Sequence, residues 1–582
     1  MMPTDRMPAG LSSSRWVEAE TPEAAGVLIE SGFSAALAGM LARRDITSES
    51  SANRFLHPTL DQLHDPFLLR GMERAVARIM AARSKAEKVV IFGDYDVDGI
   101  TATALLVAVL RALKLEVTSL LPQRLTEGYG FQPVHVHSAL EGGCRLLITA
   151  DCGSSANTAL DEAHDVGIDV IVTDHHKSSD PLPDRVIEIN PHHPECSYPF
   201  PDLSGVGLAL KLSMAVAERA GYSFEIERLL RVACLGTIAD LVPLRGENRV
   251  IAALGLRAFS TNRSPGLKAL CRMAKVRAPV MASDVGFRIG PRLNAAGRVD
   301  SPDAALELLL TRDKGRAEAL AAQLEGWNRR RQEEEKVVVE QARERILSRP
   351  TLAPIIVDWS SEWHQGVVGI AAGRIAREFH RPTVLLGVSD AIATGSGRSV
   401  PGVDIYAFMS AWQGDLERFG GHPQAIGLSV AVGRLESLRE QWEKEAGNWK
   451  DEELRPLLRY EYELSDGESL DTLLEQFAVL EPFGSGNRQP LIRIRALELQ
   501  GRLRVFGRGH LSATARTHLG SVIQLLGWGW ASRKEIMLQR FDVLGAIESD
   551  HYHSQTIVRI VDIKSTSEVG IRTRADGYMM DQ

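Results

Sequence analysis

The sequence predicts an α/β protein with a parallel-sheet domain, a long connecting helix, a smaller α/β domain and a C-terminal antiparallel β-barrel. Three observations lead to this prediction. Short apolar runs that stop at acidic residues alternate with helical stretches, a charged stretch without internal proline follows them, and strand-like runs separated by turns fill the C-terminal part. Alternating strands and helices are typical of βαβ units, which form parallel sheets covered on both faces.

Length and composition limit the classes of protein that fit. A chain of 582 residues is too long for one hydrophobic core and indicates about three or four domains. The longest apolar stretch, Ala104 to Leu110, is far shorter than the roughly 20 residues of a membrane span, and the N-terminus has no apolar signal-peptide region. We therefore expect a cytoplasmic protein without membrane segments.

The net charge and the cysteines further limit the classes of protein that fit the sequence. A net charge of −8 argues against a polycation that coats nucleic acid, although a summed charge does not exclude a local basic surface. The cysteines are scattered and form no CxxC pair, so they predict neither a zinc knuckle nor a disulfide framework: Cys144, Cys152, Cys196, Cys234 and Cys271. A reducing compartment fits this pattern.

Residues 1–50 are rich in Ser, Pro, Ala and Glu, and we expect a loosely attached leader there. Residues 51–302 contain the apolar runs KVVIFG, CRLLITA and VGIDVIVT, each followed by acidic residues, and predict the parallel sheet. Residues 303–349 are rich in Ala, Leu, Glu, Arg and Gln and predict one or two long helices that bridge domains.

The second part of the chain begins after Pro350. Residues 350–450 form the smaller α/β domain, with glycine-rich points at HQGVVG, ATGSGRS and FGGHPQAIG. A further break falls at EPFGSGN, and residues 451–582 carry the strand-like runs of the barrel and a C-terminal tail.

Acidic residues cluster where the predicted strands end. Asp94, Asp96 and Asp98 occupy alternate positions after one strand, and two further sites follow the next apolar runs: Asp151 and the triplet Asp174-His175-His176. Asp240 lies beside another apolar segment. The carboxyl ends of parallel strands meet at one edge of a sheet, where ligands bind, so we expect these side chains to converge.

Two other interpretations of the acidic residues fit less well than metal binding. An EF-hand needs a Glu at the twelfth position from Asp94, but that position is Leu105. A single Asp after a strand is more often a helix cap than a ligand, but several coincident sites favour metal binding. Carboxylates with one or two imidazoles suit Mn²⁺ or Mg²⁺, and their mutual repulsion favours two ions, which could activate water against a phosphodiester.

Together GDYDVDG, ADCG, TDHH and TIADLVPL resemble the DHH phosphoesterase superfamily, and within it the bacterial RecJ-type single-strand-specific exonucleases. GFRIGPRLNAAGR, HQGVVGIAAGRIA, SGRS, GGHPQAIGLS and EPFGSGN extend the resemblance over roughly residues 50–570. It implies a DHH catalytic domain, a long connecting helix, a DHHA1 domain and an antiparallel OB-type barrel. It also implies 5′ to 3′ hydrolysis of single-stranded DNA, with Mn²⁺ or Mg²⁺, in recombination and repair.

The resemblance also implies functional residues. The catalytic set is Asp96, Asp98, Asp151, His175, His176 and Asp240, and the metal set is Asp94, Asp96, Asp98, Asp151, Asp174, His175 and Asp240. Arg292 and Arg298 become candidates for contact with the DNA end. A single-strand-binding protein and a RecQ-type helicase are implied as partners of a monomeric, cytoplasmic enzyme that associates with the nucleoid during repair.

Further residues predict how a DNA strand is held. Glycines allow close backbone approach, and hydroxyl, guanidinium, imidazole and backbone N–H groups can bind phosphate, although glycine pairs also occur in ordinary turns. The candidates are Ser396, Arg398, Gly420, Gly421 and His422. In the barrel, Arg493, Arg495, Arg502, Arg504, Arg508 and Arg516 form a basic stretch, and Phe506, Trp528 and Trp530 can stack on bases or fill the core.

Two other functions remain open on the sequence. A nano-RNase or a cyclic dinucleotide phosphodiesterase shares the first domain, but such proteins are generally compact two-domain proteins without a basic barrel. A non-catalytic scaffold that binds single-stranded DNA should have lost metal ligands, and this sequence keeps the full carboxylate and histidine set.

Overall fold

The structure is a computed structural model that describes residues 14–566. The exceptions are residues 124–129, 179–181, 262, 300, 451, 466, 508 and 551–554, and the side chains of Arg298 and Val299. The described chain forms two compact units. One comprises Ser50–Gln332 and Leu480–Arg488, and the other comprises the remaining residues, namely the segments up to Glu49, Glu333–Val479 and from Gln489 onward.

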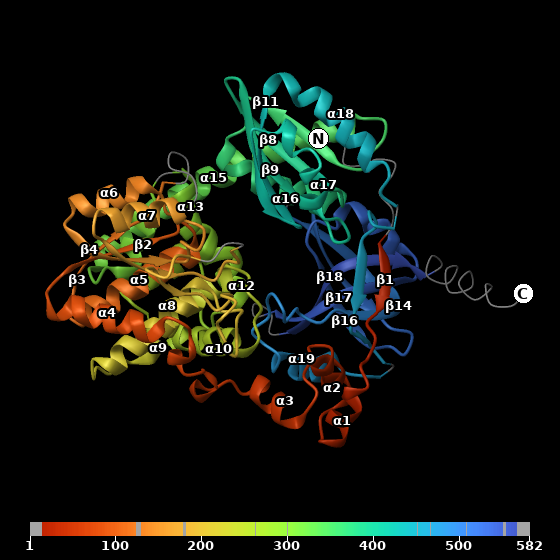
Figure 1. The fold of residues 1–582 in the computed structure, drawn as a ribbon. Coiled ribbons are helices and arrows are strands. Elements are labelled where there is room, and N and C mark those ends of the chain that lie inside the picture. The colour runs from red at the N-terminus through yellow and green to blue at the C-terminus, as the bar shows by residue number, and fades with distance from the viewer. Residues whose placement is uncertain are drawn as a thin grey trace, which may run out of the picture. The chain divides into compact units, whose positions relative to one another are not determined.

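A five-stranded sheet lies at the centre of the first unit (Figure 1). Its strand order is β3-β2-β4-β5-β6, and every pair is parallel. The strands are β2 (Lys88–Gly93), β3 (Glu116–Leu120), β4 (Cys144–Ala150), β5 (Asp169–Thr173) and β6 (Ile187–Ile189). The predicted parallel sheet is therefore confirmed.

Alternate residues of each strand face opposite sides of this sheet, and helices cover both. Val89 and Ile91 pack with α4 (Met72–Ser84), α5 (Val97–Ala112) and α8 (Gly205–Arg219). Val90 and Phe92 pack with α6 (Pro133–Glu141) and α7 (Asn157–Asp165) on the other side. Burial on both faces explains why the strands read as continuous apolar runs.

The rest of the first unit is helical. A second apolar core joins the buried face of α5 to helices that follow it in the chain. These helices are α9 (Ile226–Ala239), α10 (Gly246–Thr261), α11 (Pro265–Met273), α12 (Ala282–Asp284), η3 (Val285–Ile289), α13 (Gly290–Val299) and α14 (Asp303–Leu310). The η3 segment is a π-helix, a form that occurs in short pieces and frequently at functional sites.

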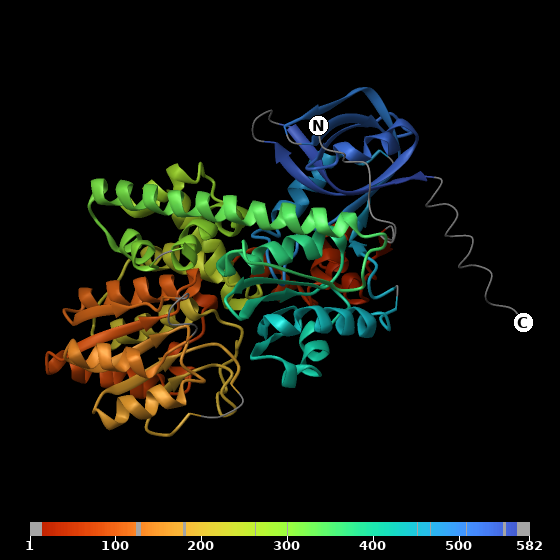
Figure 2. The ribbon, with the colours of Figure 1, turned by 90° about the horizontal axis from the view of Figure 1, so that it is seen from above.

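The predicted connecting helix is α15 (Lys314–Ser348), which is 35 residues long and is seen along its length in Figure 2. Gly315 and Gly326 lie within it without ending it. Its residues to Gln332 belong to the first unit, and those from Glu333 belong to the second.

The second unit contains a mixed five-stranded sheet of order β10-β11-β9-β8-β7. The strands are β7 (Ile356–Ser360), β8 (Thr383–Ser389), β9 (Ile392–Arg398), β10 (Arg418–His422) and β11 (Ala425–Ala431). Its helices are α16 (Gln365–Phe379), α17 (Ile405–Ser410) and α18 (Leu435–Ala446). Trp442 is fully buried and anchors α18 to the apolar face of the sheet.

A closed barrel forms the C-terminal part of this unit. The strands β14 (Ile492–Phe506), β15 (His510–Arg516), β16 (Val522–Gly527), β18 (Gln555–Ser565) and β17 (Phe541–Asp550) pair in that order, and β17 pairs back onto β14. The predicted OB-type barrel is confirmed, and its strands are antiparallel except for β16 and β18, which pair in parallel. This pairing is possible because the connection from β16 to β18 passes through β17.

The leader differs from the expectation. In the described part of residues 1–50, β1 (Arg15–Glu18) pairs in parallel with β12 (Leu457–Tyr460), and α1 (Ala24–Glu30), α2 (Ala35–Ala42) and the start of α3 (Glu49–Leu56) follow. Leu28, Met40 and Leu41 are fully buried. The segment is therefore a folded part of the chain, and its short helices were too weak a pattern to indicate this.

Two short elements precede the barrel strands, β13 (Tyr462–Glu463) and α19 (Leu470–Ala478). In the part of the chain that the structure describes, every helix is too short or too polar to cross a bilayer.

Candidate metal centre

Three acidic residues lie directly after adjacent strands of the parallel sheet. Asp94 follows β2, Asp151 follows β4 and Asp174 follows β5. The backbone continues the sheet at these points, because Asp94 N–H donates to Ala150 O at 3.1 Å and Asp151 N–H donates to Thr173 O at 2.9 Å. All three side chains are buried, and their strands end at one edge of the sheet, as the sequence predicts.

Asp96 and Asp98 extend this cluster from the start of α5. Asp96 caps the helix, since its Oδ1 accepts the Gly99 N–H at 3.0 Å. Asp98 is almost fully buried, and its two oxygens accept the N–H groups of Gly205 at 2.7 Å and Val206 at 2.9 Å. Those N–H groups belong to the first turn of α8, whose positive end favours a carboxylate.

Glycine makes the close packing of this cluster possible at two positions that sequence reasoning missed. A Cβ at Gly205 would lie 2.5 Å from Asp151, and a Cβ at Gly236 would lie 2.5 Å from Asp98 Oδ1. The Ser204-Gly-Val-Gly sequence, a helix cap followed by glycine, was the available signal for the first of them.

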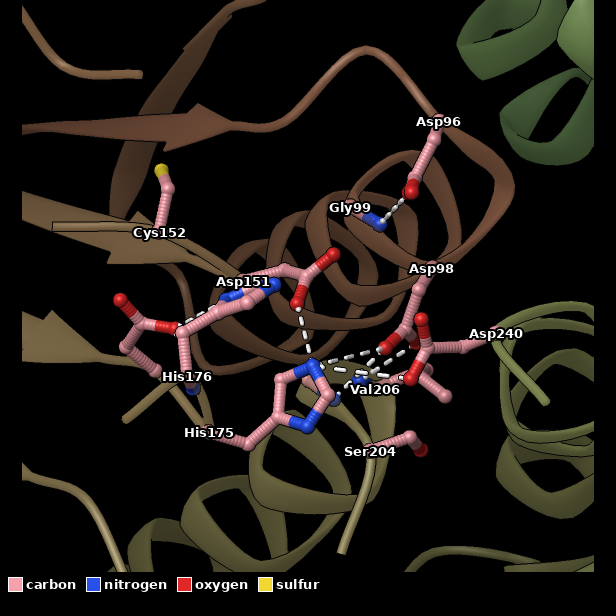
Figure 3. A network of polar contacts seen from close by, with 12 residues as sticks. Asp96, Asp98, Gly99, Asp151, Cys152, His175, His176, Ser204, Val206 and Asp240 are labelled. Carbon is pink, nitrogen blue, oxygen red and sulfur yellow. Dashed lines mark hydrogen bonds and ion pairs between the residues drawn. The ribbon is translucent and has the colours of Figure 1, made fainter. Parts of the chain in front are cut away.

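His175 lies at the centre of the site, with its Nε2 directed toward three carboxylates (Figure 3). This nitrogen is 3.1 Å from Asp151 Oδ1, 3.6 Å from Asp240 Oδ2 and 3.9 Å from Asp98 Oδ2. Asp240 comes from the C-terminal end of α9, so α9 completes a cluster that the sheet and α5 begin.

Asp174 and His176 form a separate pair beside this cluster. Asp174 Oδ1 accepts the Nδ1–H of His176 at 2.7 Å and its backbone N–H at 3.0 Å, while Oδ2 accepts the Ser154 N–H at 2.9 Å. Both oxygens of Asp174 are thus engaged within the protein, and they fix the orientation of the His176 ring.

Burial and mutual repulsion set the protonation of the cluster. Burial, followed by the charges of neighbouring carboxylates, raises the pKa of Asp98 and Asp151 well above the ordinary value. Burial and the charge of Asp96 raise the pKa of Asp240 to about 7, and burial lowers the pKa of His175 to about 4. Burial alone would lower the pKa of His176, but hydrogen bonding and attraction to Asp174 raise it to about 9.

The cluster fits divalent cations. Three overlapping groups each bring ligand atoms within 4.8 Å of one another: Asp94-Asp96-Asp151, Asp98-His175-Asp240 and Asp151-His175-His176. Among the described atoms, buried Asp151 Oδ1 and His175 Nε2 have no hydrogen-bond partner. Oxygen donors with imidazole suit Mn²⁺ or Mg²⁺, and a cation would relieve the repulsion that raises the carboxyl pKa values.

The predicted phosphate-binding residues of the second unit lie on neighbouring strands. Ser396 and Arg398 are on β9, and Gly420, Gly421 and His422 are on β10, with β11 between them. Gly427 of β11 is in register with Ser396 on one side and with Gly420 on the other. Alternation along the strands puts Ser396, Arg398, Gly420 and His422 on one face and Gly421 on the other.

Helix α16 packs against the same face. A Cβ at Gly369 of α16 would lie 3.0 Å from both Ser396 Oγ and Arg398 Nη2. Gly420 and His422 are exposed, so the face is covered by α16 at one end and open at the other.

The arginines that were predicted to bind DNA differ in how exposed they are and in whether they already form an ion pair. Arg292 pairs with Glu325 at 2.6 Å and donates to Arg288 O at 2.6 Å, and its side chain is only 14% exposed. Arg298 lies on α13, but its side chain is outside the described residues. Arg502 and Arg504 on β14 are exposed, whereas Arg493 of the same strand pairs with Asp542 at 2.7 Å.

Comparison with known proteins agrees with this architecture. Family models match three segments: the DHH family N-terminal domain at residues 88–237, the DHHA1 domain at 352–448 and the RecJ OB domain at 460–561. The fold and the site therefore define a DHH-domain protein with a DHHA1 domain and an OB-type barrel.

Individual relatives extend the match over most of the chain. The single-stranded-DNA-specific exonuclease RecJ of Dickeya dadantii is 35% identical over 85% of this chain and 88% of its own. RecJ of Bacillus subtilis is 33% identical over 89% of this chain, which spans 66% of that protein. The crystal structure of Thermus thermophilus RecJ with Mn²⁺ superposes with a TM-score of 0.80 and 28% identity, covering 94% of this chain and 79% of its own. This chain belongs to the RecJ family.

Proposed function

We propose that this protein is a metal-dependent exonuclease that hydrolyses phosphodiester bonds of single-stranded DNA in the 5′ to 3′ direction, in DNA repair and recombination. The observation that carries the proposal is the buried carboxylate cluster around His175 Nε2, at the sheet edge of a RecJ-family chain. The exposed arginines of the barrel supply a basic surface despite the net charge of −8.

The metal ligands that we propose are those with oxygens or nitrogens in the three convergent groups. They are Asp94, Asp96, Asp98, Asp151, His175 and Asp240, whereas His176, whose Nδ1 is bound to Asp174, is assigned to the substrate. We assign Asp174 to orienting His176, because Asp174 is in none of the three convergent groups and its Oδ1 accepts both the ring and the backbone N–H of His176. Two bound Mn²⁺ or Mg²⁺ ions would supply positive charge that strengthens water as a nucleophile and stabilises the charge that develops on the phosphate.

The protein itself supplies orientation and charge. The first turn of α8 holds both oxygens of Asp98, which fixes this carboxylate before substrate arrives. In the metal-free protein, burial is outweighed by hydrogen bonding and attraction to Asp174, which raise the pKa of His176 to about 9. Its partly exposed ring can then donate a hydrogen bond to a phosphate oxygen of the strand.

We further propose that the β9–β10 face of the second unit binds a DNA phosphate through Ser396, Arg398, Gly420 and His422. The support is their common face, the exposed backbone at Gly420 and the position of α16 against Ser396 and Arg398. Arg502 and Arg504 extend the strand-binding surface on the barrel. Arg292 and Arg298 remain proposed contacts of the DNA end.

Residue assignments of the metal site are tested by Asp98→Asn and Asp151→Asn. These changes keep the side-chain volume and remove a charge from the cluster. We therefore expect single-strand hydrolysis to fall by at least about a hundredfold, which is the size of effect seen when metal ligation is disturbed. Asp165→Asn, on the exposed end of α7, is the matched control.

The same assay separates the alternatives. Each protein is given a long single strand, a linear dinucleotide and a cyclic dinucleotide. Preferential hydrolysis of dinucleotides would favour a nano-RNase or cyclic dinucleotide phosphodiesterase, and strand binding without hydrolysis would favour a scaffold. Full activity of both Asn variants would contradict the proposed ligand set.

We propose that the enzyme acts as a monomer in the bacterial cytoplasm, at the nucleoid during repair, together with a single-strand-binding protein and a RecQ-type helicase. Family membership supports this proposal. Sedimentation of the purified protein with and without each partner measures both the oligomeric state and the association.

A further inference from the structure

One short loop is far in sequence from the proposed metal ligands but belongs to the first unit, which carries them. Residues Leu480–Arg488 belong to the unit formed by Ser50–Gln332, although the residues on either side of the loop belong to the other unit. The loop contains the sequence Glu481-Pro-Phe-Gly484-Ser-Gly486-Asn487, which forms part of neither the metal centre nor the proposed phosphate site.

Hydrogen bonds fix both the loop and its attachment. Asn487 Nδ2 donates to Leu480 O at 2.7 Å and to Pro482 O at 2.9 Å, which closes the loop on itself. The buried guanidinium of Arg249, on α10, donates to Leu480 O at 2.9 Å and to Glu481 O at 2.8 Å. The same guanidinium donates to Phe55 O at 2.6 Å. A single buried side chain therefore attaches the loop to the rest of the first unit.

The tip of the loop lies against the turn that carries Asp240. Leu244 N–H donates to Ser485 O at 2.7 Å. A Cβ at Gly486, where φ is +69°, would lie 2.8 Å from Pro243 Cβ and 3.1 Å from Pro243 Cα. Glycine is therefore required at Gly486 both by its backbone conformation and by the close approach of Pro243.

The turn of residues 240–245 is exposed near its start and held near its end. Asp240 is the C-cap of α9, and Leu241 has a left-handed φ of 63° and is 69% exposed. Asn248, which lies on α10, donates a hydrogen bond from its Nδ2 to Pro243 O at 3.2 Å. The loop and Asn248 thus both hold the turn by its Pro243-Leu244 end.

We infer that the loop Leu480–Arg488 positions Asp240 in the metal centre by bracing the turn of residues 240–245. This inference rests on the proposed metal centre and adds a positioning element that lies outside the DHH domain in sequence. Asp240 Oδ2 must stay near His175 Nε2, now 3.6 Å away, to share a cation with it. A turn that moves by even a small distance would weaken that shared site.

The test compares two glycines that both have a positive φ. Gly486→Ala adds a Cβ against Pro243, whereas Gly467→Ala, at φ +80°, adds one with nothing within 4 Å. Asn487→Ala removes the two hydrogen bonds that close the loop and adds no atom. It is the test variant if Gly486→Ala does not fold. Ile79→Val, in the fully buried part of α4, controls for reduced stability of the same unit.

Two measurements on metal-free protein separate positioning from general destabilisation. Hydrogen exchange of peptides covering residues 240–248 should accelerate in Gly486→Ala and Asn487→Ala but not in Gly467→Ala. Calorimetric titration with Mn²⁺ should give a Kd raised about tenfold in the two loop variants and unchanged in both controls. Saturating Mn²⁺ should restore their turnover, which it would not do for a misfolded fraction.

An unchanged Mn²⁺ Kd in both loop variants would overturn the inference while leaving the metal centre intact. Wild-type protein that binds no Mn²⁺ would overturn the metal centre and the inference together.

Discussion

At the scale of single residues, protonation controls how the metal centre assembles. Burial is the main cause that raises the carboxyl pKa values of Asp98 and Asp151, and of Asp240 to about 7. The folded metal-free protein therefore holds protons that the unfolded chain, with ordinary carboxyl pKa values near about 4, has already released. The contribution of these carboxyl groups to its stability falls as the pH rises from about 4 toward 7, because at these groups the unfolded state then binds fewer protons than the folded state.

A cation reverses this dependence, because it requires the deprotonated carboxylates. We predict that the Tm of the Mn²⁺-saturated protein rises relative to the Tm of the metal-free protein between about pH 5.5 and pH 8, because the cation then displaces fewer protons from these carboxyl groups. Thermal unfolding followed by circular dichroism measures both. Asp240→Asn should reduce the pH dependence, and an increase in Tm that is independent of pH would contradict the account.

At the scale of elements, the sequence predicted the strands and their acidic ends because buried parallel strands have a distinctive apolar pattern. Asp94, Asp151 and Asp174 could be placed at one edge by topology alone. The partners of those residues could not be predicted in this way. Asp174 accepts hydrogen bonds from the nearby His176 and from the Ser154 backbone, and Arg292 pairs with Glu325, but the pattern of apolar strands specifies neither the loop geometry nor the side-chain packing behind these contacts.

The β9–β10 face gives a prediction at this scale. Ser396→Ala and Arg398→Ala should each raise the KM for single-stranded DNA, by about tenfold for Arg398→Ala, because that change removes a charged hydrogen-bond donor to phosphate. The Mn²⁺ Kd should not change, because these residues lie in the other unit. Arg377→Ala, on the exposed side of α16, is the control, and an equal effect of Arg377→Ala would contradict a specific phosphate site.

At the scale of the whole molecule, chain order and structural unit do not coincide. The leader segment pairs through β1 with β12, more than 400 residues later, and the loop Leu480–Arg488 belongs to the catalytic unit. Local patterns cannot reveal such pairings, because nothing in a short window specifies a distant partner. Net charge was an equally poor guide, since the acid excess includes the metal cluster while Arg502 and Arg504 remain exposed on the barrel.

The central claim is that the cluster around His175 is a metal centre for hydrolysis of single-stranded DNA from its 5′ end. Its most direct test is a time course on 5′-labelled and 3′-labelled single strands, and on blunt duplex, with chelator-treated protein before and after addition of Mn²⁺. The account predicts no hydrolysis without metal, and with Mn²⁺ immediate release of the 5′ label as a mononucleotide, progressive shortening of the 3′-labelled strand and little attack on duplex. Hydrolysis that persists without metal, or mononucleotide release that begins at the 3′ label, would contradict it.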